Sequence, residues 1–445
     1  MSNRLALPVL HLTSLALGAI LCVGSLLAPA CAAEHGQLRV GAAKVDITPG
    51  TLKEMNPMGG DFVGVHDPIY LRTLLIDSGG SKVALVSVDS MEVGDTTTVR
   101  QRIEKELQIP FANILIFATH DHSAPRVGDV SPGALAHEGT TTSLAWSEGL
   151  YTTMIEALRQ SEQQAKPARF GVGKGTVNVN VNRDEYTADG WIMGVNPTGP
   201  SDKGLWVMKF DTLDGQPIAL LTNYAVHSVT TLGIKQISGD LAGVAAHYVE
   251  KTLGGNAVSL WSVGTIADQN PRIFRAGLSD TDENDAAFAW NAATTQGQTV
   301  GEAIVDVARN IKPIDMTRRV NIRAEEKVVS CPTQQGTETM ENMNQTQVAN
   351  VNLRLGLVML NDTALAGVSG EVMTRIGYRL AQSSPLRKTI LTSIVNDRIG
   401  YIPDDASYPD SIFEVKASPL KAGCAEEAIV NNFTTMIGNA LQRQK

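Results

Sequence analysis

The pattern of hydrophobic and polar positions predicts short buried strands that alternate with amphipathic helices. The clearest unit covers residues 82–89 (KVALVSVD), 97–108 and 113–118, which have the patterns of a strand, a helix with an apolar stripe and a second strand. Such a βαβ unit has parallel strands. The remaining apolar segments predict strands at 69–76, 204–210, 217–226, 257–263, 363–368 and 389–395, and helices at 143–165, 239–253, 281–311, 371–383 and 425–443.

Two segments have no hydrophobic period. Residues 178–190 and 331–347 are polar and aperiodic, so we predict loops there. No internal repeat or low-complexity linker divides the chain, and its 445 residues fit one large α/β domain as well as two. We predict one domain over residues 34–445, with mixed sheets flanked by helices and a site at the carboxyl ends of the strands.

The first 33 residues have the pattern of an export signal. Arg4 gives a positive start, residues 5–27 are mostly apolar, and Ala28, Pro29 and Ala30 form a small-residue cleavage pattern. His11 interrupts the apolar run, which disfavours a membrane anchor. We therefore expect a secreted or periplasmic mature chain, with lipoprotein anchoring through Cys31 as a weaker alternative. No later segment approaches the roughly 20 apolar residues of a membrane span.

Composition and charge exclude some classes of partner. The net charge is -9 and the chain has no basic stripe, so we expect no nucleic-acid partner. Beyond the signal only Cys331 and Cys424 remain, an even pair that predicts a disulfide in an oxidising compartment. No CxxC spacing occurs, so a thiolate zinc site is not expected.

Polar side chains collect directly after the predicted strands. His120 and His122 follow the strand at 113–118, His227 follows 217–226, and Glu371 follows 363–368 at the expected start of a helix. Two histidines and a carboxylate suit Zn²⁺, and catalytic zinc sites keep one position open. On an extended chain, side chains two residues apart share a face, so both rings of the His-Asp-His segment are expected to approach one centre. The other strand-end candidates are residues 265–271 and Tyr401.

At these residues the chain resembles the neutral/alkaline (non-lysosomal) ceramidase family. The similar segments stand in the family's order and span most of the mature chain. The more specific ones are ATHDHSAP and GYIPDDASY. All of them are AAKVDITPG (42–50), GVHDPIYLRTLLID (64–77), VALVSVD (83–89), ATHDHSAP (118–125), VNR (181–183), NYAVHSVTTL (223–232), SGDLAG (238–243), ADQNP (267–271), SGEVMTRIGYRL (369–380) and NDRIGYIPDDASY (396–408).

The resemblance implies a set of site residues. A phenol is a rare zinc ligand, but a divalent cation promotes its ionisation. In the family, the second histidine of the motif lies beside the metal, which implies proton transfer by His122. The family's substrate-binding arginine matches Arg183. The implied zinc ligands are His120, His227, Glu371 and Tyr401.

Two departures from the family matter. The family's serine segment aligns with residues 267–272, so that Asn270 stands at the serine position, where it can donate a hydrogen bond but cannot act as a nucleophile. A literal GDVSP occurs at 128–132, but in the wrong place, so we interpret Ser131 as a coincidence. The chain also ends near residue 445, where the family continues into an immunoglobulin-like domain, so we expect the catalytic domain alone.

These observations predict a zinc-dependent hydrolase of an amide bond, with ceramide or a related N-acyl lipid as the substrate and attack by metal-bound water. A metal hydrolase of a more polar amide or ester on the same scaffold is the nearest alternative. A catalytically dead binding protein is the alternative of another class, since Asn270 replaces a reactive residue. The expected partner is a lipid or other small molecule; contact with a membrane surface and the oligomeric state stay open.

Overall fold

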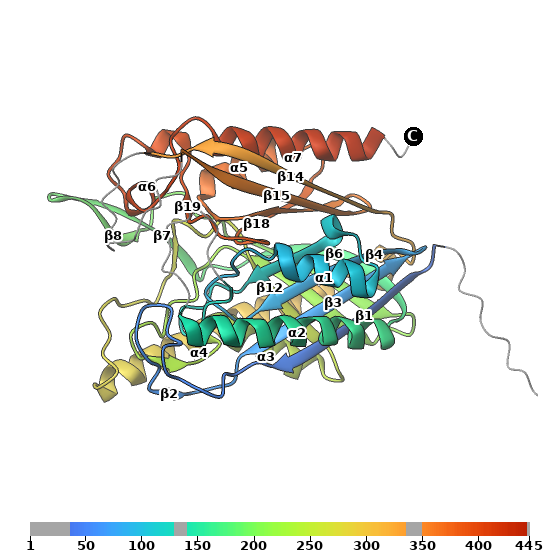
Figure 1. Ribbon diagram of the computed structural model, residues 1–445, viewed down its shortest axis with the longest axis horizontal. Helices are drawn as coiled ribbons and strands as arrows, with labels where there is room; N and C mark the ends of the chain where they lie inside the picture. The colour runs from blue at the N-terminus through green and yellow to red at the C-terminus, as the bar shows by residue number, and fades with distance from the viewer. Residues whose placement is uncertain (1–35, 129–139, 335–348, 443–445) are drawn as a thin grey trace, which may run out of the picture. The chain divides into compact units, whose positions relative to one another are not determined.

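A mixed sheet of eight strands forms the largest element of the computed structural model, which describes residues 36–128, 140–334 and 349–442 (Figure 1). Its two parallel pairs are β4–β5 and β10–β12, and its other pairs are antiparallel. In spatial order, the strands are β12 (Val258–Val263), β10 (Pro217–Tyr224), β9 (Gly204–Thr212), β6 (Lys166–Thr176), β1 (Leu38–Asp46), β3 (Tyr70–Ser78), β4 (Ser81–Val88) and β5 (Ile114–Ala118).

Helices cover one side of this sheet. The helices α1 (Thr97–Leu107), α2 (Thr141–Gln163), α3 (Asp240–Leu253) and α4 (Glu283–Asn310) share an apolar core with its strands. Alternation along β5 explains why it is buried on both faces: Ile114 and Ile116 join the core with these helices, whereas Leu115 and Phe117 join a second core.

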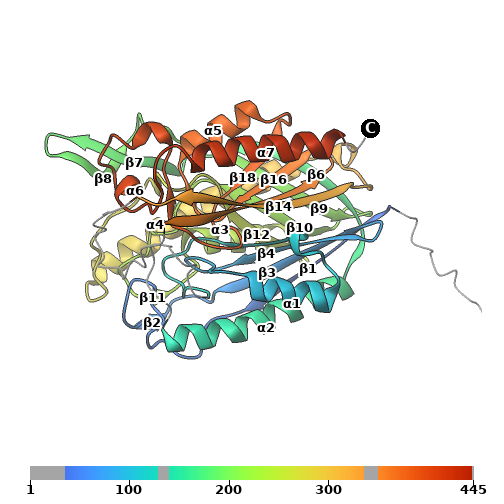
Figure 2. The ribbon, with the colours of Figure 1, turned by 45° about the horizontal axis from the view of Figure 1, so that its top comes forward.

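The second core lies between the large sheet and a smaller one of four strands. This sheet has the order β14 (Ile322–Pro332), β15 (Asn350–Leu360), β16 (Thr363–Val368) and β18 (Lys388–Thr392). Its outer face packs against α5 (Thr374–Ser383) and α7 (Ala425–Gln442), as Figure 2 shows. The molecule thus stacks two sheets between helices, and the predicted α/β class with mixed sheets flanked by helices is confirmed.

Shorter elements lie around the two sheets. The hairpin of β7 (Asn180–Thr187) and β8 (Gly190–Asn196) pairs with β13 (Gln269–Pro271). The remaining elements are β2 (Gly64–Val65), β11 (Gln236–Ile237), β17 (Glu371–Val372), β19 (Tyr401–Ile402), α6 (Phe413–Lys416) and the 3-10 helices η1 (Phe111–Asn113), η2 (Pro313–Asp315) and η3 (Asp405–Ser407).

The βαβ prediction is confirmed, because β4, α1 and β5 follow one another and β4 pairs in parallel with β5. The loop predicted at 178–190 is wrong, because most of it forms the β7–β8 hairpin. The helix predicted from residue 371 begins at Thr374, so Glu371 lies on a short strand and not at a helix start. The strands β1, β6, β14 and β15 were not predicted.

The predicted disulfide is present and joins Cys331, at the end of β14, to Cys424, just before α7. The export signal, Ser131 and most of the loop at 331–347 lie outside the described residues. Among the described helices, none has the length and apolar character needed to cross a membrane.

Candidate metal centre

The loop after β5 brings two histidine rings together by an unusual backbone conformation. His120 has φ 58°, in the left-handed region that histidine rarely adopts. The segment is therefore not extended, and the expected reason for the convergence of His120 and His122 is wrong, although the convergence itself occurs. Their Nε2 atoms lie 3.2 Å apart, with the rings edge to face.

Backbone carbonyls orient His120 and His227, which follow β5 and β10. His120 Nδ1 lies 2.8 Å from the carbonyl oxygen of Met91, and His227 Nδ1 lies 3.0 Å from that of Gln269. A carbonyl only accepts hydrogen bonds, so each Nδ1 carries the proton and donates it, which leaves the Nε2 lone pair free. Such outer contacts are typical of metal-binding histidines.

Both free nitrogens face the same carboxylate. The Nε2 atoms of His120 and His227 each lie 3.4 Å from Glu371 Oε2, and all three side chains are buried. Glu371 is the direct parallel-sheet partner of Tyr401, because β17 pairs with β19 in this register. Side chains of opposed residues in neighbouring strands lie on the same face, so the phenol of Tyr401 lies beside the carboxylate.

The convergence of acceptor atoms is the main chemical feature of the site. Neither carboxylate oxygen of Glu371 has a hydrogen-bond donor among the described residues. Two imidazole lone pairs and a buried carboxylate that face one another suit a cation between them, which would offset the cost of the buried charge together with Arg398, whose Nη2 lies 3.6 Å from Glu371 Oε1. The three histidines also offer ring nitrogens within 4.8 Å of one another, a grouping that fits a metal ion.

The electrostatics favour the protonation states that a metal ion requires. Burial, together with the charges of Arg183 and His120, lowers the pKa of His227 to about 3. Burial and the neighbouring His120 and His227 also hold the pKa of His122 well below its usual range. Burial alone would raise the pKa of Glu371, but its interactions with His120 and His227 and the charge of Arg398 lower it well below its usual range. Neutral imidazoles and an ionised carboxylate are the metal-binding forms.

Arg183 connects the candidate metal ligands with Asn270. Its Nη1 lies 3.4 Å from His227 Nε2 and 3.3 Å from Asn270 Oδ1, while its Nε donates to Glu414 Oε1 at 2.7 Å. Its guanidinium also lies over the ring of Tyr401, 5.6 Å from the centroid. The remaining nitrogen, Nη2, is buried and has no hydrogen-bond partner among the described residues, so it is a free donor within the site.

Comparison with known proteins identifies the family. A family model of the N-terminal region of neutral/alkaline non-lysosomal ceramidases matches residues 38–379. The chain belongs to this family. It is 26% identical to neutral ceramidase A of Dictyostelium discoideum over 370 residues, which are 77% of this chain and 46% of that protein. With neutral ceramidase B of the same organism it shares 28% identity over 243 residues, which are 49% of this chain and 32% of that protein.

The chain thus spans less than half the length of these two curated ceramidases. Its fold is similar to the crystal structure of neutral ceramidase from Pseudomonas aeruginosa, with a TM-score of 0.74, 15% identity, and coverage of 92% of this chain and 75% of that chain. A ceramidase complexed with C2 gives the same TM-score and identity, with 92% and 76% coverage. At this identity, the likeness shows the ceramidase fold alone.

The candidate site brings together the described residues for which the sequence predicted a metal-binding, catalytic or substrate-binding role. Sequence reasoning missed Glu414, which holds Arg183, and Arg398, whose Nη2 lies 3.6 Å from Glu371 Oε1. Arg398 lies within the family-like segment 396–408, so the motif offered a signal for it. Glu414 lies beyond every family-like segment, and its contact with Arg183, 231 residues earlier, left no local signal.

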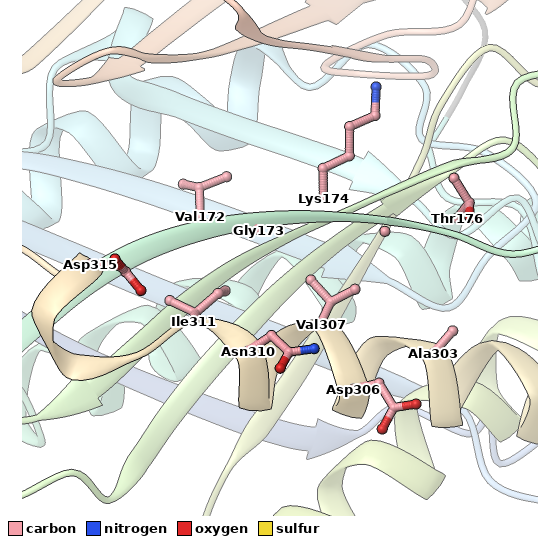
Figure 3. A pocket seen from close by; sticks show the side chains of 11 residues that line it. Val172, Gly173, Lys174, Thr176, Ala303, Asp306, Val307, Asn310, Ile311 and Asp315 are labelled. Atoms are coloured by element: carbon pink, nitrogen blue, oxygen red, sulfur yellow. The ribbon is translucent and has the colours of Figure 1, made fainter.

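A separate groove of about 400 Å³ lies between β6 and α4 (Figure 3). Its lining mixes aliphatic side chains and glycines with polar and charged ones, and contains no histidine. Glycines on β6 let the helix approach closely: a Cβ on Gly173 would lie 2.8 Å from a methyl group of Val307. No set of catalytic side chains converges on this groove, so we assign it no catalytic role.

Proposed function

We propose that the protein is a zinc-dependent amidohydrolase that cleaves the amide bond of ceramide or a related N-acyl lipid. The observation that carries the proposal is the buried convergence of His120 Nε2, His227 Nε2 and Glu371 Oε2, in which each histidine nitrogen lies 3.4 Å from the carboxylate oxygen. Membership of the ceramidase family supports the amide as the bond and the lipid as the substrate class.

The residues present fit a zinc ion. We assign His120, His227 and Glu371 as its ligands and Tyr401 as a fourth oxygen donor, because the register of β17 and β19 places the phenol beside Glu371. Burial raises the pKa of Tyr401, as does the Glu371 charge, so the phenol needs the contact with Arg183 and a cation in order to ionise. When bound, zinc would polarise the amide carbonyl and lower the pKa of a water molecule.

His122 is placed to move a proton. Its Nε2 lies 3.2 Å from the Nε2 of His120. Its Nδ1 has no hydrogen-bond partner among the described residues. Nδ1 can therefore accept a proton from water and return it to the leaving nitrogen of the amide, which must be protonated to depart as an amine. We therefore assign general acid–base catalysis to His122 rather than metal binding.

Arg183 and Asn270 are placed to orient the substrate. The free Nη2 of Arg183 can donate to the amide carbonyl or a neighbouring hydroxyl group. Asn270 Oδ1 accepts from Arg183 Nη1, which leaves its amide NH₂ available as a donor to developing negative charge. Neither side chain is a nucleophile, so the reaction proceeds by attack of water and without an acyl-enzyme. The predicted signal at residues 1–33 supports action outside the cytosol.

A metal analysis combined with a substrate panel tests the proposal. The purified wild-type protein is assayed by elemental analysis and then on long-chain ceramide, a short-chain ceramide, an N-acyl amino acid and a fatty-acid ester. We expect about one zinc per chain and turnover of the ceramides. Zinc with turnover of the more polar amide or the ester alone would assign another substrate class. Zinc without any turnover would favour a binding protein, and the absence of stoichiometric metal would refute the ligand assignment.

A further inference from the structure

The β7–β8 hairpin projects beyond the two stacked sheets (Figures 1 and 2). Several of its apolar side chains are exposed. We call residues 184–196 the arm. Four of its large apolar side chains are exposed by about half or more: Tyr186 by 71%, Ile192 by 48%, Met193 by 44% and Val195 by 52%. Scattered exposed apolar residues are common, but a cluster on one projecting element marks an interaction surface.

The register of the hairpin shows how these side chains are distributed. Tyr186 is paired with Trp191, and their rings lie 5.1 Å apart; Met193 follows Trp191 at an interval of two and shares its face. Val195 lies beyond a shift in register, where this alternation no longer applies. Ile192 is paired with Glu185 and lies on the opposite face. The arm is therefore apolar on both faces near its tip.

The arm is continuous with the candidate site. Arg183 immediately precedes it on β7, and Trp191 packs in one apolar cluster with Tyr401, Met373 and Ile412. An apolar path thus leads from the exposed face of the arm to the phenol that we assign to the metal. Whatever covers the arm therefore lies next to the apolar cluster that contains Tyr401.

Charge narrows the choice of partner. Asp189, in the turn, is the exposed charged residue of the arm. Asp184 is buried and Glu185 is half-buried, and Glu185 Oε2 accepts a hydrogen bond from the backbone N–H of Val195 at 2.9 Å. No lysine or arginine lies within residues 184–196. Such a surface suits neither an anionic lipid layer nor an ionic protein partner. It suits an uncharged, apolar partner.

We propose that the arm inserts shallowly into the surface of a zwitterionic lipid layer and so brings the site to its substrate. This inference rests on the proposed function, since a lipid substrate is what a membrane would supply. A single hydrocarbon chain bound along the hairpin would cover one face, whereas a lipid layer covers both, as the opposed Ile192 and Met193 require. Asp189 limits the depth, because a charged group remains at the level of the headgroups.

Binding to substrate-free vesicles tests the inference without catalysis. The wild-type protein is mixed with phosphatidylcholine vesicles and with vesicles containing 30% phosphatidylserine, roughly the anionic fraction needed to give a negative surface potential, and bound protein is measured by flotation. The arm variant is Ile192→Thr/Met193→Gln/Val195→Thr, which retains Trp191 because that ring packs against the site. The control variant, Ile314→Thr/Val328→Thr, removes two exposed apolar residues elsewhere, which are exposed by 89% and 47%.

We expect the wild type to bind phosphatidylcholine vesicles, and to bind the anionic vesicles more weakly. The arm variant should bind phosphatidylcholine vesicles about tenfold or more weakly, given the apolar area lost. The control variant should bind them as the wild type does. On a short-chain ceramide in solution the arm variant should turn over at the wild-type rate, whereas ceramide in vesicles should be cleaved about tenfold more slowly, in step with binding.

Several outcomes would overturn the inference. They are a wild type that does not float with phosphatidylcholine, an arm variant that floats equally well, and a concentration-dependent dimer that the arm substitutions abolish, which would assign the arm to a second copy of the chain. Loss of turnover on the soluble substrate alone would instead assign the arm to binding of the substrate chain. Vesicle binding without hydrolysis of any N-acyl lipid would contradict the proposed function and leave the arm's role intact.

Discussion

His120 combines complete burial with a strained backbone. A left-handed conformation costs a residue other than glycine about 1–3 kcal/mol, a cost that persists only where the surrounding structure imposes it. Here the strained turn aims Nδ1 at the carbonyl of Met91 and Nε2 at Glu371. The strain is therefore explained by ring orientation, which is what a metal ligand requires.

Replacing either histidine ligand should empty the site. His120→Ala and His227→Ala remove one of two neutral nitrogen donors, so we expect zinc content to fall to about a tenth or less of the wild-type value, given the 10–100-fold effects of even outer-sphere changes. Elemental analysis of the purified variants measures this. His247→Ala, an exposed histidine on α3, is the control and should retain full zinc. Full zinc in both site variants would show that the metal lies elsewhere.

His122 distinguishes two possible ligand sets, because it also lies within the histidine cluster. If Glu371 is the third ligand, His122→Ala should keep its zinc and lose roughly a hundredfold in kcat, the usual scale for a missing acid–base group. Parallel zinc analysis and turnover measurements separate the two roles. Loss of zinc in this variant would make His122 a ligand and would leave the proton transfer without a named residue.

Asn270 tests whether the reaction needs a covalent step. Because its amide contacts Arg183 and not a base, Asn270→Ser should retain turnover within about tenfold, while Asn270→Ala should lose about 10²-fold, as expected when an oxyanion donor is removed. Rapid quenching followed by mass spectrometry searches for an acyl group. An acylated serine in the wild type, at Ser123 or Ser131, would contradict direct attack by water.

At the scale of elements, the disulfide fastens the outer helix to the smaller sheet. Cys331 is fully buried at the end of β14, and Cys424 directly precedes α7. The bridge closes a loop with a sequence separation of 93, so Cys331→Ala/Cys424→Ala should lower the free energy of unfolding by about 4 kcal/mol. Urea denaturation measures the change. Zinc content should stay at the wild-type level, since neither cysteine contacts the site; its loss would show that the smaller sheet had unfolded.

The elements that the sequence predicted well are those with apolar side chains on both faces. Strands such as β5 and β12 are buried throughout, and their hydrophobic runs stand out from the flanking turns. β7 was missed because its buried positions are polar: Asn180 donates to the carbonyl of Ala225, and Asn182 donates to Asp268. These partners lie about 45 and 86 residues away. Only the tertiary structure shows which groups form hydrogen bonds with the buried polar side chains of such a strand.

At the scale of the molecule, the sequence predicted the residues of the candidate site but not how they come together. The histidines follow strands of the eight-stranded sheet, whereas Glu371 and Tyr401 follow β16 and β18 of the four-stranded sheet. Strand ends therefore identified the individual residues, and the family resemblance selected among them. The ends of the two sheets meet because the sheets stack on a shared core. The residues of that core are far apart in the sequence, so no local sequence pattern predicts the stacking.

Because the ligands come from both sheets, the metal should stabilise the contact between them. Binding to the folded state alone adds RT ln(1 + [L]/Kd), or about 4 kcal/mol when free zinc exceeds Kd a thousandfold. Removing the metal with a chelator should therefore lower the Tm by several degrees, and zinc should restore it. Amide hydrogen exchange should accelerate in residues 119–122 and 371–372 together, because both segments carry ligands of the same ion.

Glu371→Gln keeps the shape of the side chain but removes the anionic donor, so zinc should raise its Tm much less than that of the wild type. Glu148→Gln, an exposed change on α2, is the matched control and should respond to zinc as the wild type does. Equal zinc-dependent shifts in Glu371→Gln and wild type would mean that the ion does not join the two sheets.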